Sequence, residues 1–319
     1  MLYTVLGKTG LRISRIALGT WQFGSRQWGY DVSYSRSDCI EALRAAVEHG
    51  VNLVDTAEVY GSGLSEEIVG EAVKGLRERV VIATKVSPMN LTYDGVIKAC
   101  GRSLRRLGVK TIDLYQIHFP NPLIPISWTM KAMEKLVEMG WISYIGVSNF
   151  SLKRLIKAQE ALRREEIVSD QVKYNLLERG VERELLPYAE REGLTILAYS
   201  PLAQGLLTGK YSRDRQPRDL IRKVNLLFAN MGRVEPVLAK LRELAGRMGV
   251  EPGQIALRWL ISRENVSAIV GVKNVGQALS AAASPDIALS EEDYEELDRL
   301  SRQVKISRNY AKILRRLLS

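Results

Sequence analysis

Hydrophobic and polar positions follow two alternating patterns along most of the chain. One is a short, nearly continuous apolar run, such as residues 51–54, which is too short for a helix and too apolar for an exposed strand. The other is a longer segment with apolar positions at helical spacing, such as residues 93–107, which ends at Gly108. We therefore expect inner strands of a parallel sheet that alternate with helices.

This alternation predicts eight strand–helix units. The expected strands cover residues 16–18, 51–54, 79–85, 112–118, 142–147, 170–173, 195–199 and 267–270. The expected helices cover residues 38–49, 93–107, 126–139, 151–165, 183–192, 234–248 and 252–262, and one more begins near Ser65. Eight such units wind around one closed sheet, so the predicted fold class is an α/β protein with a (β/α)8 TIM barrel.

Two additions to this barrel are expected. Residues 3–18 form two short strands about the turn 7–10, and this hairpin would close the bottom of the barrel. Extra helices precede the eighth strand, at 234–248 and 252–262, and follow it at the C-terminus. The chain contains no linker or low-complexity tract, so residues 1–319 are expected to form a single domain.

Local signals predict where some elements end. His49 and Gly50 would cap the first helix, with Gly50 in a left-handed conformation. Ser65 is expected as the N-cap of the next helix, because Glu66 and Glu67 would then lie in its first turn. Residues 200–233 are expected to form a long loop whose second part is rich in Arg.

The net charge of +10 does not by itself indicate a nucleic-acid partner. Basic and acidic side chains alternate in segments such as 182–184 and 190–192, which is typical of solvated helix faces. A net positive charge is also compatible with an enzyme that binds a small molecule with phosphate groups. We expect neither a nucleic-acid partner nor a metal site.

No apolar run approaches the roughly 18 residues that span a bilayer, and the N-terminus lacks a signal-peptide pattern. The two cysteines, Cys39 and Cys100, fall in expected helices, and we interpret them as core residues in a reducing compartment. These observations predict a soluble, cytoplasmic protein without membrane insertion.

Polar side chains stand where three successive strands are expected to end. Asp55 ends the second strand, Tyr60 lies in the loop after it, Lys85 ends the third strand and His118 ends the fourth. The C-terminal ends of barrel strands hold the chemistry of (β/α)8 enzymes, so these four are the candidate catalytic residues. Asp55 would keep Lys85 charged and aimed at Tyr60, and the ammonium is expected to lower the pKa of the tyrosine hydroxyl.

This set of groups suits delivery of a proton to an oxygen that is becoming an alkoxide. His118, as a neutral donor, would bind a carbonyl oxygen. No side chain can supply a hydride, so a reduction requires a cofactor.

The segment after the first strand has a composition that suits ligand contact. Gly19 lets the backbone approach a ligand, and we assign Gly19, Thr20 and Trp21 to cofactor contact. Trp21 is also expected to contact the substrate, together with Tyr60 and His118. Trp28 and Tyr30 follow in the same loop, and for these two both packing within the loop and substrate contact remain open.

The candidate residues lie in motifs that resemble the aldo-keto reductase family over nearly the whole chain. The motifs are Asp55-Thr-Ala-Glu-Val-Tyr-Gly61, Ala83-Thr-Lys85, Asp113-Leu-Tyr-Gln-Ile-His118 and Ile145-Gly-Val-Ser-Asn-Phe150. The resemblance implies NADPH-dependent reduction of an aldehyde or ketone, reversible as alcohol oxidation, with Tyr60 as the general acid.

The resemblance also implies where the nicotinamide would bind. Ser148, Asn149 and Gln171 would hydrogen-bond the carboxamide, and Tyr199 would stack on the ring. Asp55 would also lie at this end of the cofactor.

For the phosphates and adenosine, the resemblance implies a second set of contacts. The loop with Ser200, Leu202 and Gly205 would hold the pyrophosphate, with charge added by Lys210, and the adenosine end would meet Gly271, Lys273 and Gln277. Lys273 would contact a 2′-phosphate near a helix N-terminus, which favours NADP over NAD. Ser280 and Ala281 depart from the Glu-Asn pair that many relatives use for adenine, so Gln277 is the only one of those adenine contacts retained.

Two other functions remain open at this point. One is a regulatory subunit similar to the aldo-keto-reductase-like β-subunits of potassium channels, which bind NADPH and modulate a membrane partner. The other is a lyase that uses Lys85 as a Schiff-base nucleophile. The substrate would be a small carbonyl compound, selected by the loops after strands one, four and seven and by the C-terminal tail.

Residues 306–318 form a basic amphipathic pattern at the C-terminus. We expect this segment to dock on its own barrel or on a second copy of the chain in a homo-oligomer. Binding to a membrane surface is the alternative.

Overall fold

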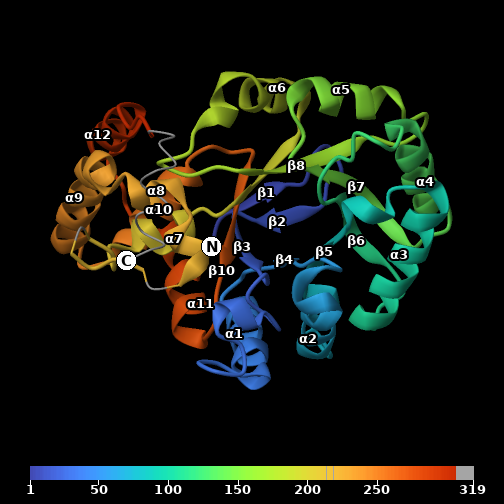
Figure 1. Cartoon of the computed structure of the whole chain (residues 1–319), viewed down its shortest axis with the longest axis horizontal. Helices are drawn as coiled ribbons and strands as arrows, with labels where there is room; N and C mark the ends of the chain where they lie inside the picture. The colour runs from blue at the N-terminus through green and yellow to red at the C-terminus, as the bar shows by residue number, and fades with distance from the viewer. Residues whose placement is uncertain (213, 218, 307–319) are drawn as a thin grey trace.

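The computed structural model describes residues 1–212, 214–217 and 219–306. Eight parallel strands form a closed barrel in the order β10-β3-β4-β5-β6-β7-β8-β9 (Figure 1). The strands are β3 (Ile16–Gly19), β4 (Leu53–Asp55), β5 (Val81–Val86), β6 (Ile112–Ile117), β7 (Ile142–Ser148), β8 (Ile167–Lys173), β9 (Thr195–Tyr199) and β10 (Val266–Gly271). The predicted (β/α)8 architecture is confirmed.

Helices surround the barrel and connect its strands (Figure 1). They are α1 (Arg36–Glu48), α2 (Leu64–Ala72), α3 (Tyr93–Leu107), α4 (Ile126–Glu138), α5 (Leu152–Glu160), α6 (Leu185–Glu192), α9 (Met231–Met248), α10 (Pro252–Leu260), α11 (Val275–Ala282) and α12 (Glu291–Arg302). The extra helices before the last strand are α9 and α10, as expected. The amphipathic segment 306–318 lies outside the described residues apart from Ile306.

The N-terminal hairpin closes the lower end of the barrel. Its strands β1 (Tyr3–Val5) and β2 (Arg12–Ser14) pair antiparallel. Leu6 and Ile13 are fully buried and pack with apolar side chains of the barrel interior. Gly7 adopts a positive φ of 56°, and a Cβ atom there would lie 2.8 Å from the Cβ atom of Val168. This tight contact explains why a glycine stands at the turn that fits into the barrel.

The prediction that Ser65 caps α2 is wrong. Gly63, with a φ of 100°, precedes the helix, and Ser65 lies in its first turn. The buried Ser65 hydroxyl donates to the Thr20 carbonyl oxygen at 2.9 Å and contacts the hydroxyls of Thr20 and Thr56 at 2.8 and 2.9 Å. These bonds tie the helix to the ends of β3 and β4, so a residue with N-cap chemistry is used here for tertiary contact.

Two expected element boundaries are also corrected. The helix predicted to reach residue 165 ends at Glu160, since the N–H groups of Arg163 and Arg164 donate to the Glu134 carboxylate at 2.7 and 2.8 Å. The strand after it starts at Ile167, three residues earlier than predicted.

The loop predicted for residues 200–233 contains short helices. These are η6 (Ala203–Thr208), α7 (Leu220–Lys223) and α8 (Leu226–Ala229), and α9 already begins at Met231. The Asn225 side chain caps α8 by accepting the Leu227 N–H at 2.9 Å. Such short helices escape periodicity because four residues do not complete a pattern.

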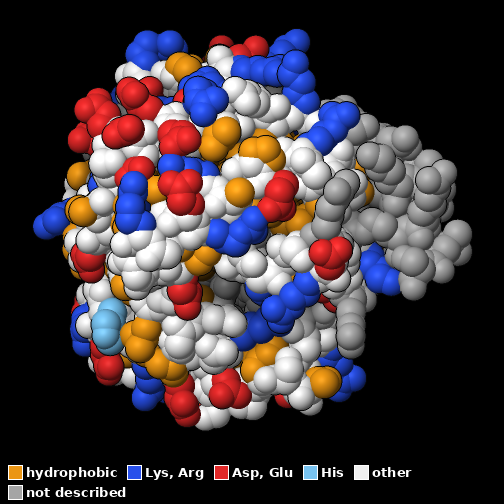
Figure 2. All heavy atoms as spheres, turned by 90° about the vertical axis from the view of Figure 1, so that its left-hand side faces the viewer, with side chains coloured by type: hydrophobic (Ala, Val, Ile, Leu, Met, Phe, Trp, Pro, Cys, Tyr) orange, Lys and Arg blue, Asp and Glu red, His pale blue; other side chains and the backbone are white. Residues whose placement is uncertain are grey.

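The described residues contain no helix long and apolar enough to cross a membrane. On the face that carries α9 and α12, acidic and basic side chains interleave (Figure 2). Cys39 and Cys100 are buried on α1 and α3, where burial raises the pKa of each thiol to about 12. Both cysteines are core residues, as interpreted from the sequence.

Asp170 on β8 is a buried carboxyl group without a partner. Neither of its oxygens has a hydrogen-bond partner among the described residues, and it is fully shielded from solvent. Burial raises the pKa of Asp170 to about 8, although the nearby Phe150 backbone N–H, which does not reach hydrogen-bond geometry, acts in the opposite direction. The folded protein therefore holds a proton at this site that the unfolded chain releases above its ordinary pKa near 3.8.

Because the folded protein holds this proton, we expect the free energy of unfolding to fall as pH rises from about 4 to about 8. Within that window the folded state binds more protons than the unfolded state, so deprotonation favours unfolding. Between pH 5 and pH 8 the native chain should lose about 2 to 4 kcal/mol more unfolding free energy than Asp170→Asn does. Urea unfolding at each pH measures this difference. The exposed Asp31→Asn serves as the control and should leave the pH slope unchanged. Equal slopes for Asp170→Asn and the native chain would contradict the assignment.

Candidate active site

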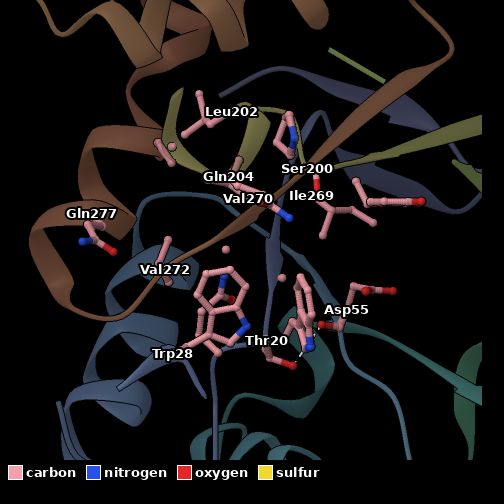
Figure 3. Close-up of a pocket in the computed structure, with 18 of the residues that line it drawn as sticks. Thr20, Trp28, Asp55, Ser200, Leu202, Gln204, Ile269, Val270, Val272 and Gln277 are labelled. Atoms are coloured by element: carbon pink, nitrogen blue, oxygen red, sulfur yellow. Dashed lines mark hydrogen bonds between the residues drawn. The ribbon is translucent and has the colours of Figure 1, made fainter. Parts of the chain in front are cut away.

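A cavity of about 780 Å³ opens at the C-terminal ends of the barrel strands. It extends from Asp55 at one side to Gln277 at the other, with Trp28 and Val272 between them (Figure 3). Its volume lies within the range of roughly 300 to 1,000 Å³ typical of cofactor and small-molecule sites. The predicted site residues from β3, β4, β6, β7, β8, β9 and β10 meet around this one cavity.

Lys85 is the charged centre of the site. Its side chain is fully buried, and its ammonium donates to Asp55 Oδ1 at 2.6 Å, to the Thr56 carbonyl oxygen at 2.7 Å and to the Tyr60 hydroxyl at 3.4 Å. Burial lowers the pKa of the ammonium, but Asp55 and Tyr60 together raise the pKa above its ordinary value. The structure thus joins Asp55, Tyr60 and Lys85, which the strand ends predicted, and Lys85 is held protonated.

The second oxygen of Asp55 is bound by two amides. Gln116 Nε2 donates to Asp55 Oδ2 at 3.1 Å, and Gln171 Nε2 donates to the same oxygen at 2.8 Å. Gln171 Nε2 also lies 3.3 Å from Gln116 Oε1. Gln171, predicted for the nicotinamide carboxamide, lines the cavity while its amide donates to the Asp55 carboxylate.

The expected lowering of the Tyr60 pKa is not observed. Burial raises the pKa of the hydroxyl, Lys85 lowers it and Asp55 raises it again, with a net increase. The expectation considered only the nearby Lys85 ammonium. It did not include the effect of burial on the hydroxyl or the negative charge of Asp55. Tyr60 is therefore a neutral hydroxyl that can donate a proton.

His118 completes the four predicted groups as a neutral ring. Burial, followed by the repulsion of Lys85, lowers the pKa of His118 to about 3. The ring lies 5.6 Å from that of Tyr60 in an edge-on arrangement and 5.2 Å from that of Phe119 in a stacked one. A neutral imidazole beside a phenol can donate a hydrogen bond to a ligand oxygen throughout the physiological pH range.

Three of the other predicted nicotinamide residues form one hydrogen-bonded group. Asn149 Nδ2 donates to Ser148 Oγ at 2.9 Å and to the His118 carbonyl oxygen at 3.1 Å, while the Tyr199 hydroxyl donates to Asn149 Oδ1 at 2.9 Å. Asn149 has a φ of 62°. All three line the cavity, and the bonds fix the direction in which the Asn149 amide points.

The residues predicted for the pyrophosphate line the middle of the cavity. They are Ser200, Leu202, Gly205 and Lys210. Ser200, Ala203 and Gln204 have φ values of 53°, 48° and 55°, so three non-glycine residues in this short segment are left-handed. Such strain costs of order 1–3 kcal/mol per residue and clusters at functional sites.

Lys273 adds charge to the cavity near Gln277 and holds a loop. Its ammonium donates to the Trp28 carbonyl oxygen and lies 5.1 Å from the centre of the Tyr34 ring. Burial, followed by repulsion from Arg222 and Lys210, lowers the pKa of Lys273. Three cations therefore lie in the same part of the cavity, and Asp219, which pairs with Arg222 at 2.8 Å, offsets their repulsion only in part.

The end of the cavity near α11 contains a carboxylate. Ser280 Oγ donates to Glu251 Oε2 at 2.6 Å, and Gln254 Nε2 donates to the Ser280 carbonyl oxygen at 2.9 Å. The predicted Gln277 lies here as well, where its Oε1 accepts the Lys273 N–H at 3.0 Å. Glu251 comes from the start of α10, and it lines the cavity beside the position where Ser280 departs from the family pattern.

The segment after β3 lines the cavity opposite these groups. Gly19, Thr20 and Trp21 all reach it, and the Trp21 ring lies 5.0 Å from that of Trp28 and 6.5 Å from that of Tyr60. Trp28 is a cavity residue, whereas Tyr30 is buried against Tyr34 and does not line the cavity. Gly271, also predicted, lines the cavity at the end of β10.

Some residues that contribute to the site were not predicted, and three of them take part in its charge or hydrogen bonding. They are Gln116, Arg222 and Glu251. Alternate residues of a strand face the same side, and Leu114 on β6 faces the barrel interior. Gln116, two residues later, could therefore have been predicted to face the interior as well. Arg222 lies in a segment without a pattern, and the contact of Glu251 with Ser280 joins two helices that only the fold brings together.

The comparisons with known proteins assign the family. The family model "Aldo/keto reductase family" matches residues 15–302. An uncharacterized oxidoreductase of Mycobacterium tuberculosis is 46% identical over 294 residues, covering 91% of this chain and 90% of its own. A probable voltage-gated potassium channel subunit β of Arabidopsis thaliana is 35% identical over 292 residues, covering 85% and 86%.

A solved structure extends this likeness to the fold. The aldo/keto reductase of Klebsiella pneumoniae in complex with NADP and acetate is 34% identical, with a TM-score of 0.74 and coverage of 93% of this chain and 95% of its own. The chain belongs to the aldo/keto reductase family, which confirms the resemblance and places it among the NAD(P)H-dependent oxidoreductases.

The support of Asp55 by Gln116 leads to a stability prediction. Gln116→Leu keeps the size of the side chain but removes one of the two amide donors to Oδ2 of the buried Asp55 carboxylate, so it should lower the unfolding free energy by about 2 kcal/mol. Ser169→Ala is the matched control, since Ser169 is also buried in the barrel and its hydroxyl has no partner among the described residues. Urea unfolding measures both, and equal effects of the two changes would contradict the role of Gln116.

Proposed function

We propose that this protein reduces aldehydes or ketones to alcohols with NADPH, reversibly, and that Tyr60 donates the proton. The observation that carries the proposal is the buried Lys85 ammonium between Asp55 and the Tyr60 hydroxyl, with a neutral His118 beside it. This arrangement supplies a proton and stabilises a developing oxyanion, which is what carbonyl reduction requires of the protein.

The residues of the cavity fit a dinucleotide phosphate. The cavity extends from Asp55 to Gln277 and is large enough for most of such a ligand (Figure 3). Its lining includes Lys210, Arg222 and Lys273, which would meet the phosphates. Ser148, Asn149, Gln171 and Tyr199 would hold the nicotinamide at the end near Tyr60. The NADP named in the Klebsiella complex supports the same choice of cofactor. When bound, the reduced nicotinamide supplies the hydride.

The protein groups would act on the substrate oxygen. The Tyr60 hydroxyl and the His118 ring would both donate to the carbonyl oxygen, which aligns the substrate and polarises the carbonyl. Tyr60 would then give its proton to the alkoxide. The Lys85 ammonium would stabilise the phenolate left behind, and Asp55 would keep that ammonium in place.

The adenine would bind beside Glu251. Ser280 lacks the carboxylate that many relatives carry at this position, and Glu251 brings a carboxylate from α10 to within hydrogen-bond distance of Ser280 Oγ. A carboxylate accepts hydrogen bonds from an exocyclic amino group. We infer that Glu251 compensates for the departure at Ser280 and Ala281.

A regulatory role is the second candidate function. The likeness to a plant potassium channel β-subunit favours it, and such a role is compatible with an intact set of four catalytic groups. The lyase alternative is disfavoured, because a Schiff-base nucleophile must be a neutral amine and Lys85 is held as an ammonium by three acceptors.

Removing the proton donor tests the reductase function. Tyr60→Phe should abolish nearly all turnover, by about a hundredfold or more, because it deletes the general acid. NADPH affinity, followed by fluorescence quenching, should stay within a few fold. Tyr188→Phe on α6, outside the cavity, is the control. Unchanged turnover in Tyr60→Phe would refute the mechanism, and NADPH binding without turnover in the native chain would favour the regulatory role.

Lys273 is proposed to select the 2′-phosphate. Lys273→Ala should weaken NADPH by about tenfold or more and NADH much less, since only NADPH carries the additional phosphate that the ammonium would meet. Titration of each cofactor against protein fluorescence measures this, with the exposed Lys153→Ala on α5 as a control. Equal losses for the two cofactors would mean that Lys273 does not contact the 2′-phosphate.

A further inference from the structure

Two buried carboxylates stand on either side of Tyr60 in the chain and take no part in the proposed chemistry. They are Glu58, which is 9% exposed, and Glu66, which has no exposed surface. Glu58 belongs to the sequence motif of residues 55–61, and Glu66 lies in the first turn of α2. A buried carboxylate requires compensation by a cation or by several donors. The partners of these two groups therefore show how the loop of Tyr60 is held.

Both carboxylates pair with the same face of α3. Arg102 Nη2 donates to Glu58 Oε2 at 3.2 Å, and Arg106 Nε donates to Glu66 Oε2 at 2.6 Å. Residues four apart lie on one face of a helix, so α3 presents its two guanidinium groups side by side. The helix therefore carries one attachment point for each end of the segment 58–66.

The same carboxylates also bind the strand that carries Lys85. Glu66 Oε1 accepts the hydroxyl of Thr84, which directly precedes Lys85, at 2.6 Å. Glu58 Oε1 accepts the N–H of Ser87, the residue after β5, at 2.7 Å. The loop of the proposed general acid and the strand of the ammonium are thus joined by two groups, one on each side of the contact between them.

The loop between the two carboxylates has a strained backbone. Residues 61–63, which follow Tyr60, have φ values of 54°, 56° and 100°. Arg106 packs against this turn, since a Cβ atom on Gly63 would lie 2.8 Å from its Cδ atom. A left-handed conformation is unfavourable for a residue with a side chain, so Ser62 keeps it only where its surroundings hold it. The guanidinium on this turn is placed to do so.

The contact that these attachments would control is a long one. The Lys85 ammonium lies 3.4 Å from the Tyr60 hydroxyl, whereas it lies 2.6 Å from Asp55 Oδ1. A hydrogen bond of that length is lost after a small displacement of either partner. Lys85 is fixed by its strand and by Asp55, so the loop of Tyr60 is the part that requires further support.

We propose that Arg102 and Arg106 are positioning residues, which set the Tyr60 hydroxyl against the Lys85 ammonium through the two buried carboxylates. The proposal rests on the reductase function proposed above, in which Tyr60 gives its proton and Lys85 stabilises the phenolate. Neither arginine is among the described residues that line the cavity, so each would act through the loop and not through a bound ligand. Precise placement matters because a displacement of about 1 Å at a reacting group can cost about a hundredfold in rate.

Single-turnover kinetics test this role. The rate of NADPH oxidation by an aldehyde that the native chain reduces should fall by about tenfold or more in Arg106→Met and in Arg102→Met. The dissociation constant of NADPH should stay within about threefold, because the cofactor site is unchanged. Arg106→Lys keeps a cation beside Glu66 and should retain the native rate to within about threefold. Arg105→Met, at an exposed position between the two on α3, is the matched control and should leave the rate unchanged.

The pH dependence separates positioning from a loss of stability. Lys85 and Asp55 are the charged groups that act on the Tyr60 hydroxyl, and His118 and Tyr199 are other titratable neighbours. A hydroxyl that moves away from Lys85 loses the cation that favours its phenolate, so its pKa should rise. Reduction requires the protonated hydroxyl, so the alkaline limb of the pH–rate profile should move up by about half a pH unit or more in both methionine variants. An unshifted profile, or a native rate in both variants, would overturn the proposal.

Arg102→Met keeps the proposal testable if Arg106→Met does not fold. The Arg102 side chain is 40% exposed, and its removal leaves Glu58 with the Ser87 N–H and Asn90 Nδ2 as donors. Release of this end of the loop alone should still slow turnover and shift the pH profile. A native rate together with a native profile in Arg102→Met would overturn the proposal.

Hydrogen exchange separates failure of this role from failure of the proposed function. Backbone amides of the loop, such as the Tyr60 N–H on the Ala57 carbonyl oxygen, should exchange about tenfold faster or more in the two methionine variants and at the native rate in Arg105→Met. If the native chain reduces no aldehyde, the reductase function fails, and exchange alone decides whether the arginines hold the loop. Faster exchange confined to the two variants supports this role, and unchanged exchange overturns it.

Discussion

The burial of one ammonium group constrains much of this structure. Lys85 has no exposed surface, and a charge removed from water must be compensated at short range. Asp55, the Thr56 carbonyl oxygen and Tyr60 provide that compensation, and Gln116 and Gln171 in turn satisfy the second oxygen of Asp55. Each partner comes from the end of a barrel strand or the loop after it, so these contacts require β4, β5, β6 and β8 to present their side chains at the same end of the barrel. The orientation of the Tyr60 hydroxyl, and hence the proposed proton transfer, depends on this compensation.

Outside this group, the charged and the uncharged side chains of the cavity come from different parts of the barrel. The strands before β8 contribute aromatic and neutral polar groups, and the segments from β8 onward contribute four cations and one acid, namely Lys173, Lys210, Arg222, Lys273 and Glu251. In the proposed function, this division would let an anionic cofactor and a carbonyl substrate approach one another over Tyr60 without competing for the same contacts. The same division accounts for part of the net positive charge of the chain. Cations gather where phosphates would bind, whereas on the face with α9 and α12 basic and acidic side chains interleave (Figure 2).

Backbone strain is concentrated on the cofactor side of the site. Among the described residues, six non-glycine positions have a positive φ, and four of them, Asn149, Ser200, Ala203 and Gln204, lie at or next to the cavity. Asn149 is held by Ser148, His118 and Tyr199, so its unfavourable conformation is offset by hydrogen bonds that aim its amide into the cavity. Asp170, which precedes Gln171 on β8, adds a buried carboxyl group that also costs stability. Packing of the rest of the barrel must compensate for these unfavourable contributions. They occur where the proposed function requires side chains in fixed positions.

The sequence by itself determined the barrel and the four groups at its centre. Apolar runs and helical spacing are local patterns, and the rule that parallel strands end at one face brings Asp55, Lys85 and His118 together without further information. Ser65 was misread because its N-cap chemistry is local while its actual partners, Thr20 and Thr56, belong to other strand ends. The net direction of the Tyr60 pKa, the support of Asp55 by Gln116 and the meeting of Glu251 with Ser280 were decided only by the tertiary structure. Each depends on burial or on a contact between segments far apart in the chain, and neither quantity is encoded in the residues near a single position.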